Sequence, residues 1–567
     1  MNQTRMLLIL AWLMVATMLW MAWGKEQSPP AAPTAAVVAP GQVAAVPGVD
    51  ATGSPGVPGM SPLPASTSAS PATTARPAVV TVQTDVLEVA LDGGEVRQAD
   101  LLAYPGTADA DSAPVRLFAQ DPANYFVAQA GWVSSGSQAP GHDAGFVLDR
   151  AALPAGADFD LDPGEQALVV PFVWTGPDGV SIHRTYTFTR GDYAVQVRDE
   201  VVNHSNAPWQ GFIYRQLVRV PRALESSGPL SVEQYSFQGA AWFGAGEYDK
   251  RQYEDFVEDG PLNQQVTGGW IAMLQHHFFG AWIPAEDATS TFSLATPSGT
   301  GGTQYLIREL GPGVDVAPGA TAATQARLWV GPKLVANIQS QRVPGLERAV
   351  DFSSFSIMAT LAGWLFWVLA KLHGLLGNWG WAIVGLVVIL KLVMFPLSAA
   401  QYKSMAKMRK FQPRMAQLKE RYGDDRQKLQ SAMMERYKKE KINPVGGCLP
   451  LLVQMPVFLA LYWTLLEAVE LRHAPWILWI DDLTAADPFF VLPVINIALM
   501  WATQKLNPMT GIDPMQAKMM QFMPVVMGVV FAFFPAGLVL YWVTNAGLGL
   551  IQQWWMVKKY SEEPVKA

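Results

Sequence analysis

The chain has 567 residues, of which 50% are hydrophobic and only 15% are charged, with a formal net charge of -7. This composition is typical of a membrane protein that carries a soluble part, and it excludes a simple globular protein. The single cysteine, Cys448, excludes disulfides within the chain, so any domain in an oxidising compartment must be held together by its own core.

The first predicted element is a membrane anchor at residues 1–26. Arg5 precedes an apolar run at residues 6–23 that is longer than the apolar region of a usual signal peptide, and no small-x-small cleavage site follows. We therefore expect an uncleaved transmembrane signal anchor, with a cleaved signal peptide as the alternative. Residues 27–78 contain eleven prolines and are predicted to be a disordered linker rich in Pro and Ala, outside the membrane.

Residues 79–335 are predicted to form one large β-sandwich domain. Short alternating runs such as VVTVQTDVLEVAL and GVSIHRTYTFTR, separated by Gly, Pro, Asn and Asp, are typical of strands. No nucleophile motif is present, and the domain's histidines lack metal-ligand spacing, so we interpret it as non-catalytic and without a metal. These histidines are His142, His183, His204, His276 and His277. The last two are interpreted as packing or strand-edge residues.

Residues 336–378 are predicted to be a linker followed by an amphipathic helix. Apolar residues recur at helical spacing up to Leu372, and a glycine-rich break follows. The helix could span the membrane or lie flat on it. If residues 6–23 cross outward and residues 379–397 cross back, charge bias leaves no crossing for this helix. We therefore expect it on the outer interface, with the β-domain outside as well.

Five apolar stretches are predicted to span the membrane and to form the core at residues 379–557, which makes six spans with the anchor. They cover residues 379–397, 448–466, 489–506, 519–534 and 536–557. The fourth has only sixteen residues and is interrupted by Pro524, which predicts a locally thinned bilayer. The positive-inside rule places both termini, including the tail at residues 558–567, in the cytoplasm.

Lys391 puts a cation inside the first of these spans. At about 1.5 Å per residue it lies about 18 Å from Trp379, and a charge within a span costs about 2.5–3.5 kcal/mol. Such residues favour a wet cavity, although a snorkelling side chain is the alternative. Other polar residues within the spans favour the cavity when taken together, while each alone is compatible with helix packing. They are Gln454, Thr464, Asn496, Gln504, Thr544 and Asn545.

Residues 399–442 are predicted to form a cytoplasmic helical hairpin that turns near Gly423. Residues 399–441 hold 13 lysines and arginines against 5 aspartates and glutamates. They could act only as a topology signal and a surface for anionic phospholipids. Methionines among the charges offer a soft surface for varied hydrophobic segments. The predicted contact residues are Met405, Met408, Arg409, Lys410, Met433 and Met434.

Several sequence blocks resemble the Gram-negative form of the YidC family, membrane protein insertases related to the mitochondrial Oxa and chloroplast Albino proteins. The blocks are GNWGWAI, MFPLSAAQYKSMAKMRKFQP, NPVGGCLPLLVQMPVFLALYW, DPMQAKMMQFMP and FPAGLVLYWVTN, in family order. The resemblance implies a multi-pass α-helical protein of the bacterial inner membrane. It also implies a five-helix insertase core and a periplasmic all-β domain, a β-supersandwich. The groove of the core would be hydrophilic, open to the cytoplasm and sealed on the outer side.

The resemblance also implies which residues line the groove. They are Lys391, Gln454, Met455, Phe458, Tyr541 and Trp542. The family's cation is usually arginine, so Lys391 keeps the charge but loses the planar fork. Trp542 replaces a tyrosine, and Val387 replaces a polar residue. A transporter that uses Lys391 as a counter-charge is the rival function, but residues 379–557 show no internal repeat.

The partners implied by the resemblance are nascent membrane proteins, components of the Sec translocon, the ribosome and the signal recognition pathway. The basic charge of the predicted hairpin indicates anionic phospholipids as a further partner. We expect a membrane insertase and chaperone, not an enzyme, acting as a monomer or within a larger complex and without nucleic-acid specificity. No cofactor is expected, since no phosphate-cradling motif is present.

Overall fold

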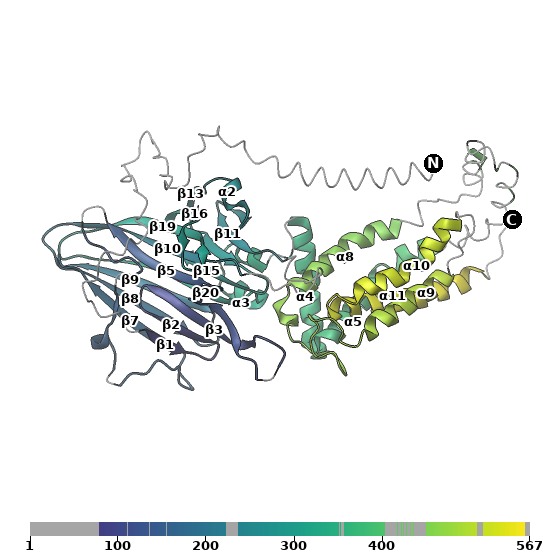
Figure 1. Cartoon of the computed structure of the whole chain (residues 1–567), viewed down its shortest axis with the longest axis horizontal. Coiled ribbons are helices and arrows are strands. Elements are labelled where there is room, and N and C mark those ends of the chain that lie inside the picture. Colours follow the sequence, from purple (N-terminus) through teal and green to yellow (C-terminus); the bar gives the residue numbers. More distant parts are fainter. Residues whose placement is uncertain are drawn as a thin grey trace. The chain divides into compact units, whose positions relative to one another are not determined.

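The structure of the chain is a computed structural model that describes two stretches of sequence, each with gaps. The first is residues 79–350 without 110, 135–136, 144, 155 and 223–235; the second is 352, 356–402, 449–506 and 514–561, with isolated positions between 417 and 435. The predicted anchor, the Pro-rich linker and most of the predicted hairpin lie outside the described residues. The chain forms two compact units, a β-sheet unit up to residue 350 and a helical unit from residue 351 (Figure 1).

The β-sheet unit contains two large antiparallel sheets, each of nine strands among the described residues. In the first sheet, neighbouring strands follow the order β1-β2-β3-β5-β10-β19-β16-β13, and β4 pairs with β3. Its strands are β1 (Val80–Gln83), β2 (Leu87–Leu91), β3 (Glu95–Pro105), β4 (Pro114–Phe118), β5 (Phe126–Ser134), β10 (Trp209–Arg219), β13 (Asn263–Thr267), β16 (Thr289–Ala295) and β19 (Tyr305–Val316).

The second sheet follows the order β12-β11-β14-β15-β20-β9-β8-β7-β6. Its strands are β6 (Val147–Leu148), β7 (Ala167–Thr175), β8 (Val180–Thr189), β9 (Ala194–Asn203), β11 (Gly239–Gly244), β12 (Glu247–Gln252), β14 (Trp270–Leu274), β15 (Phe278–Pro284) and β20 (Thr321–Pro332). A small hairpin pairs β17 (Ser298–Gly299) with β18 (Gly302–Thr303). The short helices are η1 (Arg150–Ala152), α2 (Asp255–Glu258), α3 (Val335–Ser340) and η3 (Leu346–Val350).

The core of this unit lies between the two sheets, where β10 and β19 of the first sheet pack on β14, β15 and β20 of the second. Side chains alternate along the strands, so every second residue of β8 is buried. Five tryptophans fill the interior with almost no exposed surface: Trp132, Trp209, Trp270, Trp282 and Trp329. The predicted all-β domain is therefore confirmed in its coarse form.

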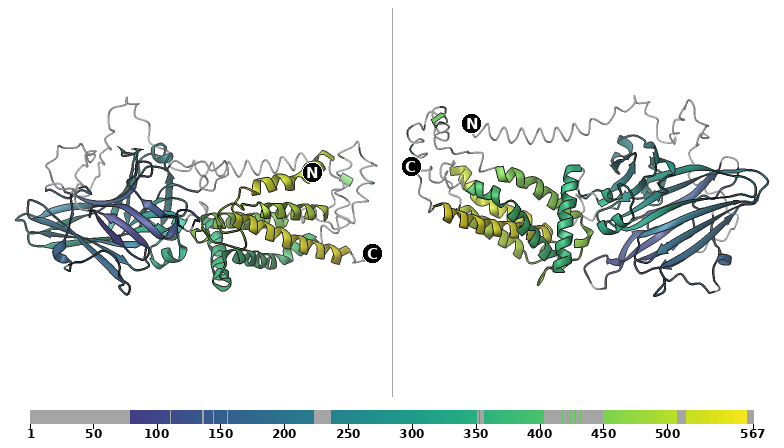
Figure 2. Two further views of the ribbon diagram at one scale, coloured as in Figure 1. Left: turned by 60° about the horizontal axis from the view of Figure 1, so that its bottom comes forward. Right: turned by 180° about the vertical axis from the view of Figure 1, so that it is seen from behind.

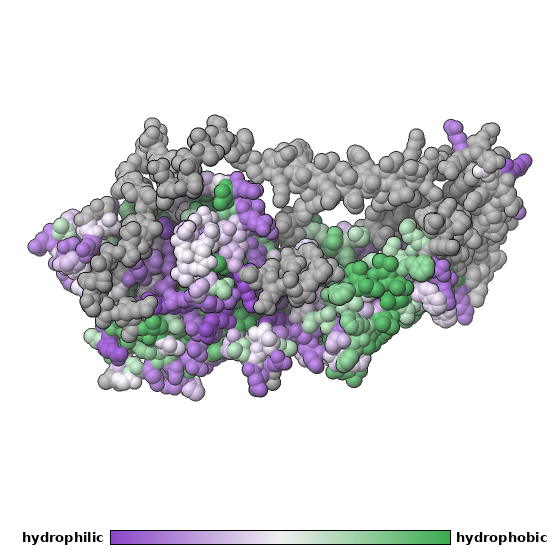
Figure 3. Space-filling model, viewed as in Figure 1, coloured by the Kyte–Doolittle hydropathy of each residue, from purple (hydrophilic) through white to green (hydrophobic). Residues whose placement is uncertain are grey.

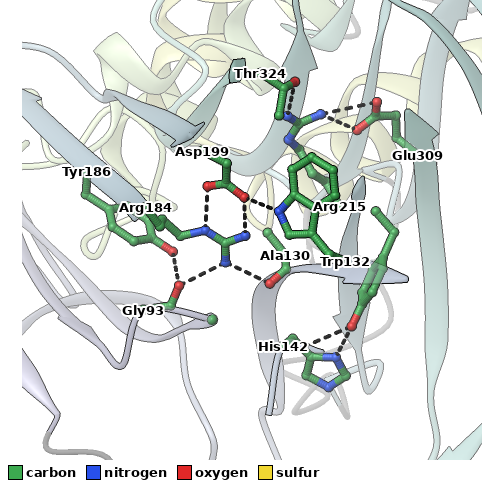
Figure 4. A network of polar contacts seen from close by, with 12 residues as sticks. Gly93, Ala130, Trp132, His142, Arg184, Tyr186, Asp199, Arg215, Glu309 and Thr324 are labelled. Atoms are coloured by element: carbon green, nitrogen blue, oxygen red, sulfur yellow. Dashed lines mark hydrogen bonds and ion pairs between the residues drawn. The ribbon is translucent and has the colours of Figure 1, made fainter. Parts of the chain in front are cut away.

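A buried ion pair ties the sheets together (Figure 4). The guanidinium of Arg184 donates two hydrogen bonds to Asp199, at 2.7 and 2.6 Å, and two more to the carbonyls of Gly93 and Ala130, at 2.9 and 2.8 Å. The indole N–H of Trp132 donates to the same carboxylate at 2.7 Å. Because both ions have good hydrogen-bond geometry, the pair offsets the desolvation of two charges in the core.

His142, which is labelled in Figure 4, contacts Tyr214. The backbone N–H of His142 donates to the Tyr214 hydroxyl at 2.9 Å, and the ring Nδ1 lies 2.8 Å from the same oxygen. A Cβ at Gly131 would lie 2.6 Å from that hydroxyl, so only glycine leaves room for the contact. Burial lowers the pKa of His142, and this effect outweighs the nearby charge of Asp143, which raises the pKa.

The helical unit contains six longer helices among the described residues. They are α4 (Ser356–Leu376), α5 (Trp379–Val393), α8 (Leu449–Glu467), α9 (Val491–Leu506), α10 (Pro514–Phe531) and α11 (Ala536–Ser561), and η5 (Val469–Leu471) follows α8. Helix α11 packs on α9, α5 and α8, while α10 packs on α9. Helix α4 packs on α5 and α8 and runs across the direction of the other helices in every view (Figures 1 and 2).

Two predicted spans differ from the helices in the structure. The stretch at residues 379–397 is not one straight helix, because α5 ends at Val393 and the chain bends by 61° into a helix at Phe395–Tyr402. Pro396 has no N–H to continue the α5 ladder and fits the first turn of a new helix. The predicted interruption at Pro524 is wrong, since α10 runs continuously through it.

The described helices differ in their capacity to cross a membrane. By length and hydropathy, Ile357–Leu376 within α4 is the one described helix that could cross alone, and α5 with the bent segment after it forms a second candidate. The apolar helical stretches in α8, α9 and α10 are shorter. Helix α4 ends at Leu376 and is followed by Gly377, whose φ of 68° is a left-handed conformation that favours glycine, and Asn378 then caps α5.

Candidate functional site

Lys391 lies in the last turn of α5, beside α11. A Cβ built on Gly549 of α11 would lie 3.4 Å from the Lys391 Nζ, so the ammonium rests against a residue without a side chain. Lys391 is half-buried, and no ion pair or hydrogen bond joins it to another of the described residues. The C-terminal end of α5 partly stabilises the cation, because free carbonyls carry negative charge there.

A line of residues on one face of α11 leads to this ammonium. Tyr541, Asn545 and Gly549 follow one another at intervals of four residues, so they lie on one face of the helix. The side-chain amide of Gln454 on α8 donates to the Asn545 Oδ1 at 3.4 Å. Because one helical turn rises about 5.4 Å, this amide pair lies about one turn along α11 from Lys391. The two helices therefore present a polar strip within an apolar unit.

Aromatic rings close the strip on the side away from Lys391. Phe458 of α8 stacks on Trp542 and Tyr541 of α11, with ring centroids 5.6 and 6.2 Å apart. Trp542 in turn stacks on Phe531 of α10 at 3.8 Å. Tyr541 is only 3% exposed. The rings join three helices at this end of the strip, where Phe458 is half-buried.

The structure brings together most of the groove residues expected from the sequence. Four of them meet between α8 and α11: Gln454, Phe458, Tyr541 and Trp542. Lys391 of α5 contacts α11 farther along that helix, at Gly549. Met455 is 45% exposed on α8. The expected hairpin contacts fall outside the described residues: Met405, Met408, Arg409, Lys410, Met433 and Met434.

Two of the polar residues noted in the sequence serve packing instead. The Thr464 hydroxyl is buried and donates to the Ala460 carbonyl in its own helix at 2.7 Å. The Ala362 carbonyl of α4 lies 3.3 Å from the same hydroxyl oxygen. Asn496 is also buried, and its amide contacts the Met500 sulfur at 3.8 Å. The packing interpretation holds for these two residues.

Sequence reasoning missed Gly549 and Gln552. Gly549 continues the spacing of four from Tyr541 through Asn545, and that interval was the signal that could have found it. Gln552 follows on α11, and within the described part of the chain its buried amide nitrogen has no hydrogen-bond partner. The polar strip therefore extends toward the C-terminal half of α11.

The other end of the unit is closed by the connection between α8 and α9, residues 468–490. The Asn378 amide at the start of α5 donates to the carbonyls of Pro475 and Trp476 at 3.0 and 3.2 Å. The first N–H groups of α11, from Ala536 and Gly537, donate to carbonyls of this connection at 2.7 and 2.8 Å. The connection is thus bonded to two helix ends, and at α11 these bonds satisfy free backbone N–H groups.

On the face shown in Figure 3, apolar side chains gather over the helical unit, whereas the β-sheet unit shows a mixture of polar and apolar ones. On α10 the buried positions Pro524, Gly528 and Phe531 form a narrow stripe against α9, and a Cβ on Gly528 would meet Ile497. The rest of α10 exposes large apolar residues: Met519, Phe522, Met523, Val525, Val526 and Val529. A continuous exposed apolar surface of this kind fits lipid.

In the β-sheet unit no comparable site is apparent among the residues described. Within the described part of this unit, no group of three histidine, cysteine, aspartate or glutamate side chains could hold a metal. His276 and His277 stack on each other at 3.7 Å in the turn between β14 and β15.

Comparison with known proteins gives matches along almost all of the described chain. The family profile described as "YidC periplasmic domain" matches residues 79–368, and that described as "60Kd inner membrane protein" matches residues 371–563. Membrane protein insertases YidC from Xanthomonas euvesicatoria and Stenotrophomonas maltophilia R551-3 are each 56% identical, over 100% of this chain and 99% and 98% of theirs. The chain belongs to the YidC family.

YidC proteins are membrane protein insertases and not enzymes, which confirms the function predicted from the sequence. The two profiles identify an inner-membrane protein with a periplasmic domain, and the β-sheet unit falls within the periplasmic profile. A crystal structure of an active YidC insertase with its first transmembrane domain resolved covers 84% of this chain and 94% of its own, at 18% identity and a TM-score of 0.36.

Proposed function

We propose that this chain inserts newly made membrane proteins through a hydrophilic groove between α5, α8 and α11, which opens to the cytoplasm. One observation carries the proposal: the Lys391 ammonium lies against Gly549, in line with the Asn545–Gln454 pair, and lacks a counter-ion among the described residues. A cation without a partner in a membrane unit is costly unless it meets water or a ligand. A polar flank of the cargo supplies that ligand.

The cargo's own apolar surface supplies the driving force. The polar flank enters the strip near Lys391, while the apolar segment slides along the exposed surface of α10 and α9 into lipid. Removing apolar area from water contributes about 25 cal/mol per Å². The Lys391 charge lowers the cost of bringing an acidic or polar flank into the bilayer. No nucleotide is needed, and Gln454 with Asn545 offers hydrogen bonds along the path.

The proposed topology has six spans with both termini in the cytoplasm. The basic hairpin at residues 399–442 and the exposed Lys558 and Lys559 at the end of α11 then lie inside. The connection at residues 468–490 faces the periplasm and seals the groove there, which the bonds to Asn378 and Ala536 support. Helix α4 lies on the outer interface, a placement supported by its crosswise direction (Figure 2).

The proposed partners fall on both sides of the membrane. On the cytoplasmic side, the 13 cations and the interleaved methionines of the hairpin suit nascent hydrophobic segments, the ribosome, the signal recognition pathway and anionic phospholipids. In the periplasm, the β-sheet unit docks components of the Sec translocon, with which the insertase also works. Each of these assignments follows family resemblance together with charge.

Photocrosslinking tests the groove directly. A photoreactive amino acid is placed at Gln454 or Phe458, and a short membrane protein is translated in the presence of membranes. We expect crosslinks from both positions to the nascent chain. Val529, which is exposed on the lipid-facing side of α10, is the control and should crosslink to the apolar segment only. Crosslinks from Val529 alone would refute the groove.

Replacement of the cation tests its part in the mechanism. Lys391→Ala should reduce insertion of a small two-span cargo more than Lys391→Arg, because arginine restores the charge. The readout is protease protection of the cargo in cells. Undiminished insertion of every cargo by Lys391→Ala would remove the lysine from the mechanism.

A further inference from the structure

The connection between α8 and α9 carries large apolar side chains that the described chain leaves uncovered. Leu478 is 76% exposed and Phe489 is 66% exposed, and the neighbours Ile477 and Phe490 are exposed by 42% and 49%. A loop that faced only water would more often carry polar residues at such positions. These four residues are named here the apolar tips of the connection.

The apolar tips are held in place by the rest of the loop. Leu478 and Phe490 both have a φ of 57°, a left-handed conformation that is unfavourable for residues with a Cβ. The turn around Leu478 is closed by a hydrogen bond from the Trp476 N–H to the Ile480 carbonyl at 2.9 Å. The Trp479 indole donates to Asp487 at 3.0 Å, and its ring contacts Phe489 edge-on at 6.0 Å. Strain of this kind persists only where the surroundings enforce it.

The tips lie at the level where the helices end. Asp487 accepts hydrogen bonds from the N–H groups of Phe489 and Leu492 at 3.1 and 2.7 Å, so it fixes the start of α9. Beyond Phe490, exposed residues recur on α9 at Val494, Ala498 and Trp501, spaced as one helix face. Phe490 therefore continues the exposed apolar stripe of α9 without a break.

We propose that Ile477, Leu478, Phe489 and Phe490 enter the outer leaflet at the boundary between headgroups and acyl chains and so anchor the closed end of the helical unit on lipid. Lipid is favoured over a protein partner because the apolar surface is continuous with the lipid-facing stripe of α9. Trp479 lies between the tips with its N–H bonded inward, an arrangement that suits the membrane interface. The proposal rests on the proposed topology but not on the groove or on Lys391.

The test uses a fluorophore that reports polarity, attached to a single cysteine. The full-length protein carries Cys448→Ser together with Leu478→Cys or Phe489→Cys and is placed in lipid nanodiscs without any other protein. We expect blue-shifted emission from both positions and quenching by lipids that carry a nitroxide near the headgroup. Asp481→Cys, in the same loop and exposed, is the matched control and should emit as in water, without such quenching.

The outcomes separate the proposal from its alternatives. Emission from Leu478→Cys and Phe489→Cys that matches the Asp481→Cys control in nanodiscs would overturn the lipid anchor. If the emission of these labels were blue-shifted only in native membranes and not in nanodiscs, a protein partner would cover the tips and the proposal would also fail. Labelling of Asp481→Cys by a membrane-impermeant reagent from the periplasmic side checks the topology separately, so a wrong topology is recognised as such.

Discussion

Gly549 offers a sharp perturbation of the proposed cargo site. A Cβ at this position would lie 3.4 Å from the Lys391 Nζ, which is ordinary van der Waals contact. We therefore expect Gly549→Ala to be tolerated. Gly549→Leu instead places a branched apolar side chain over the ammonium, while the charge itself remains. The pair of variants separates access to the cation from the presence of the cation.

The size of the effect follows from Coulomb's law. A cargo carboxylate at about 4 Å from Nζ is attracted by about 4 kcal/mol at an effective dielectric constant of about 20, and by about 2 kcal/mol at about 8 Å. If the leucine holds the carboxylate at the larger distance, the loss of about 2 kcal/mol corresponds to a decrease of about 30-fold in occupancy of the site. We expect Gly549→Leu to resemble Lys391→Ala.

The assay is insertion of a two-span cargo with an acidic flank, followed by pulse labelling and protease protection in cells depleted of the native protein. Gly547→Ala is the control, because a Cβ there would lie 3.7 Å from Leu499 of α9 and away from Lys391. Protein level and membrane localisation are checked for each variant. Insertion at the wild-type rate by folded Gly549→Leu would show that cargo does not meet the ammonium at this face.

Three further predictions concern stability. Arg184→Met leaves the Asp199 carboxylate buried without its partner, and the free energy of unfolding in urea should fall by about 3–5 kcal/mol. The matched Arg198→Met breaks an exposed pair and should cost less than about 1 kcal/mol; equal losses would contradict the argument. Burial lowers the folded-state pKa of His142, so the folded state favours the neutral ring. The contribution of His142 to the free energy of unfolding is therefore fully present above a pH of about 6.5, the ordinary value, and is lost as pH falls through the folded-state pKa. His142→Gln should therefore flatten the loss of stability in acid, and an unchanged acid profile would refute this. Asn378→Ala removes a helix cap and two loop contacts, so thermal unfolding of the helical unit should show a loss of about 1–2 kcal/mol, and an unchanged midpoint would count against the cap.

The sequence predicted the β-sheet unit well because its signal is local. Alternation along β8 and the turn residues between strands indicate strands without any knowledge of their partners. The order of strands and the role of Arg184 could not be predicted in this way. An arginine in an alternating run gives no sign that its carboxylate partner lies on the next strand in the core.

The candidate site was predicted in part. Lys391 stands out in an apolar run, and the other groove positions came from family resemblance. The distance from Lys391 to Gly549 depends on how α5 packs against α11, which spacing within one helix does not determine. The bend before Pro396 and the continuity of α10 at Pro524 show that the same residue type can end one helix and sit within another, according to the packing around it.

Reactivity of a cysteine at residue 391 tests the central claim most directly. In a Cys448→Ser background, Lys391→Cys is treated with a membrane-impermeant maleimide from either face of the membrane, and Lys558→Cys serves as the cytoplasmic control. We expect residue 391 to be labelled from the cytoplasmic face and not from the periplasmic face. Failure of cytoplasmic labelling at residue 391, with the control labelled, would mean that the site is dry and would contradict the proposed groove.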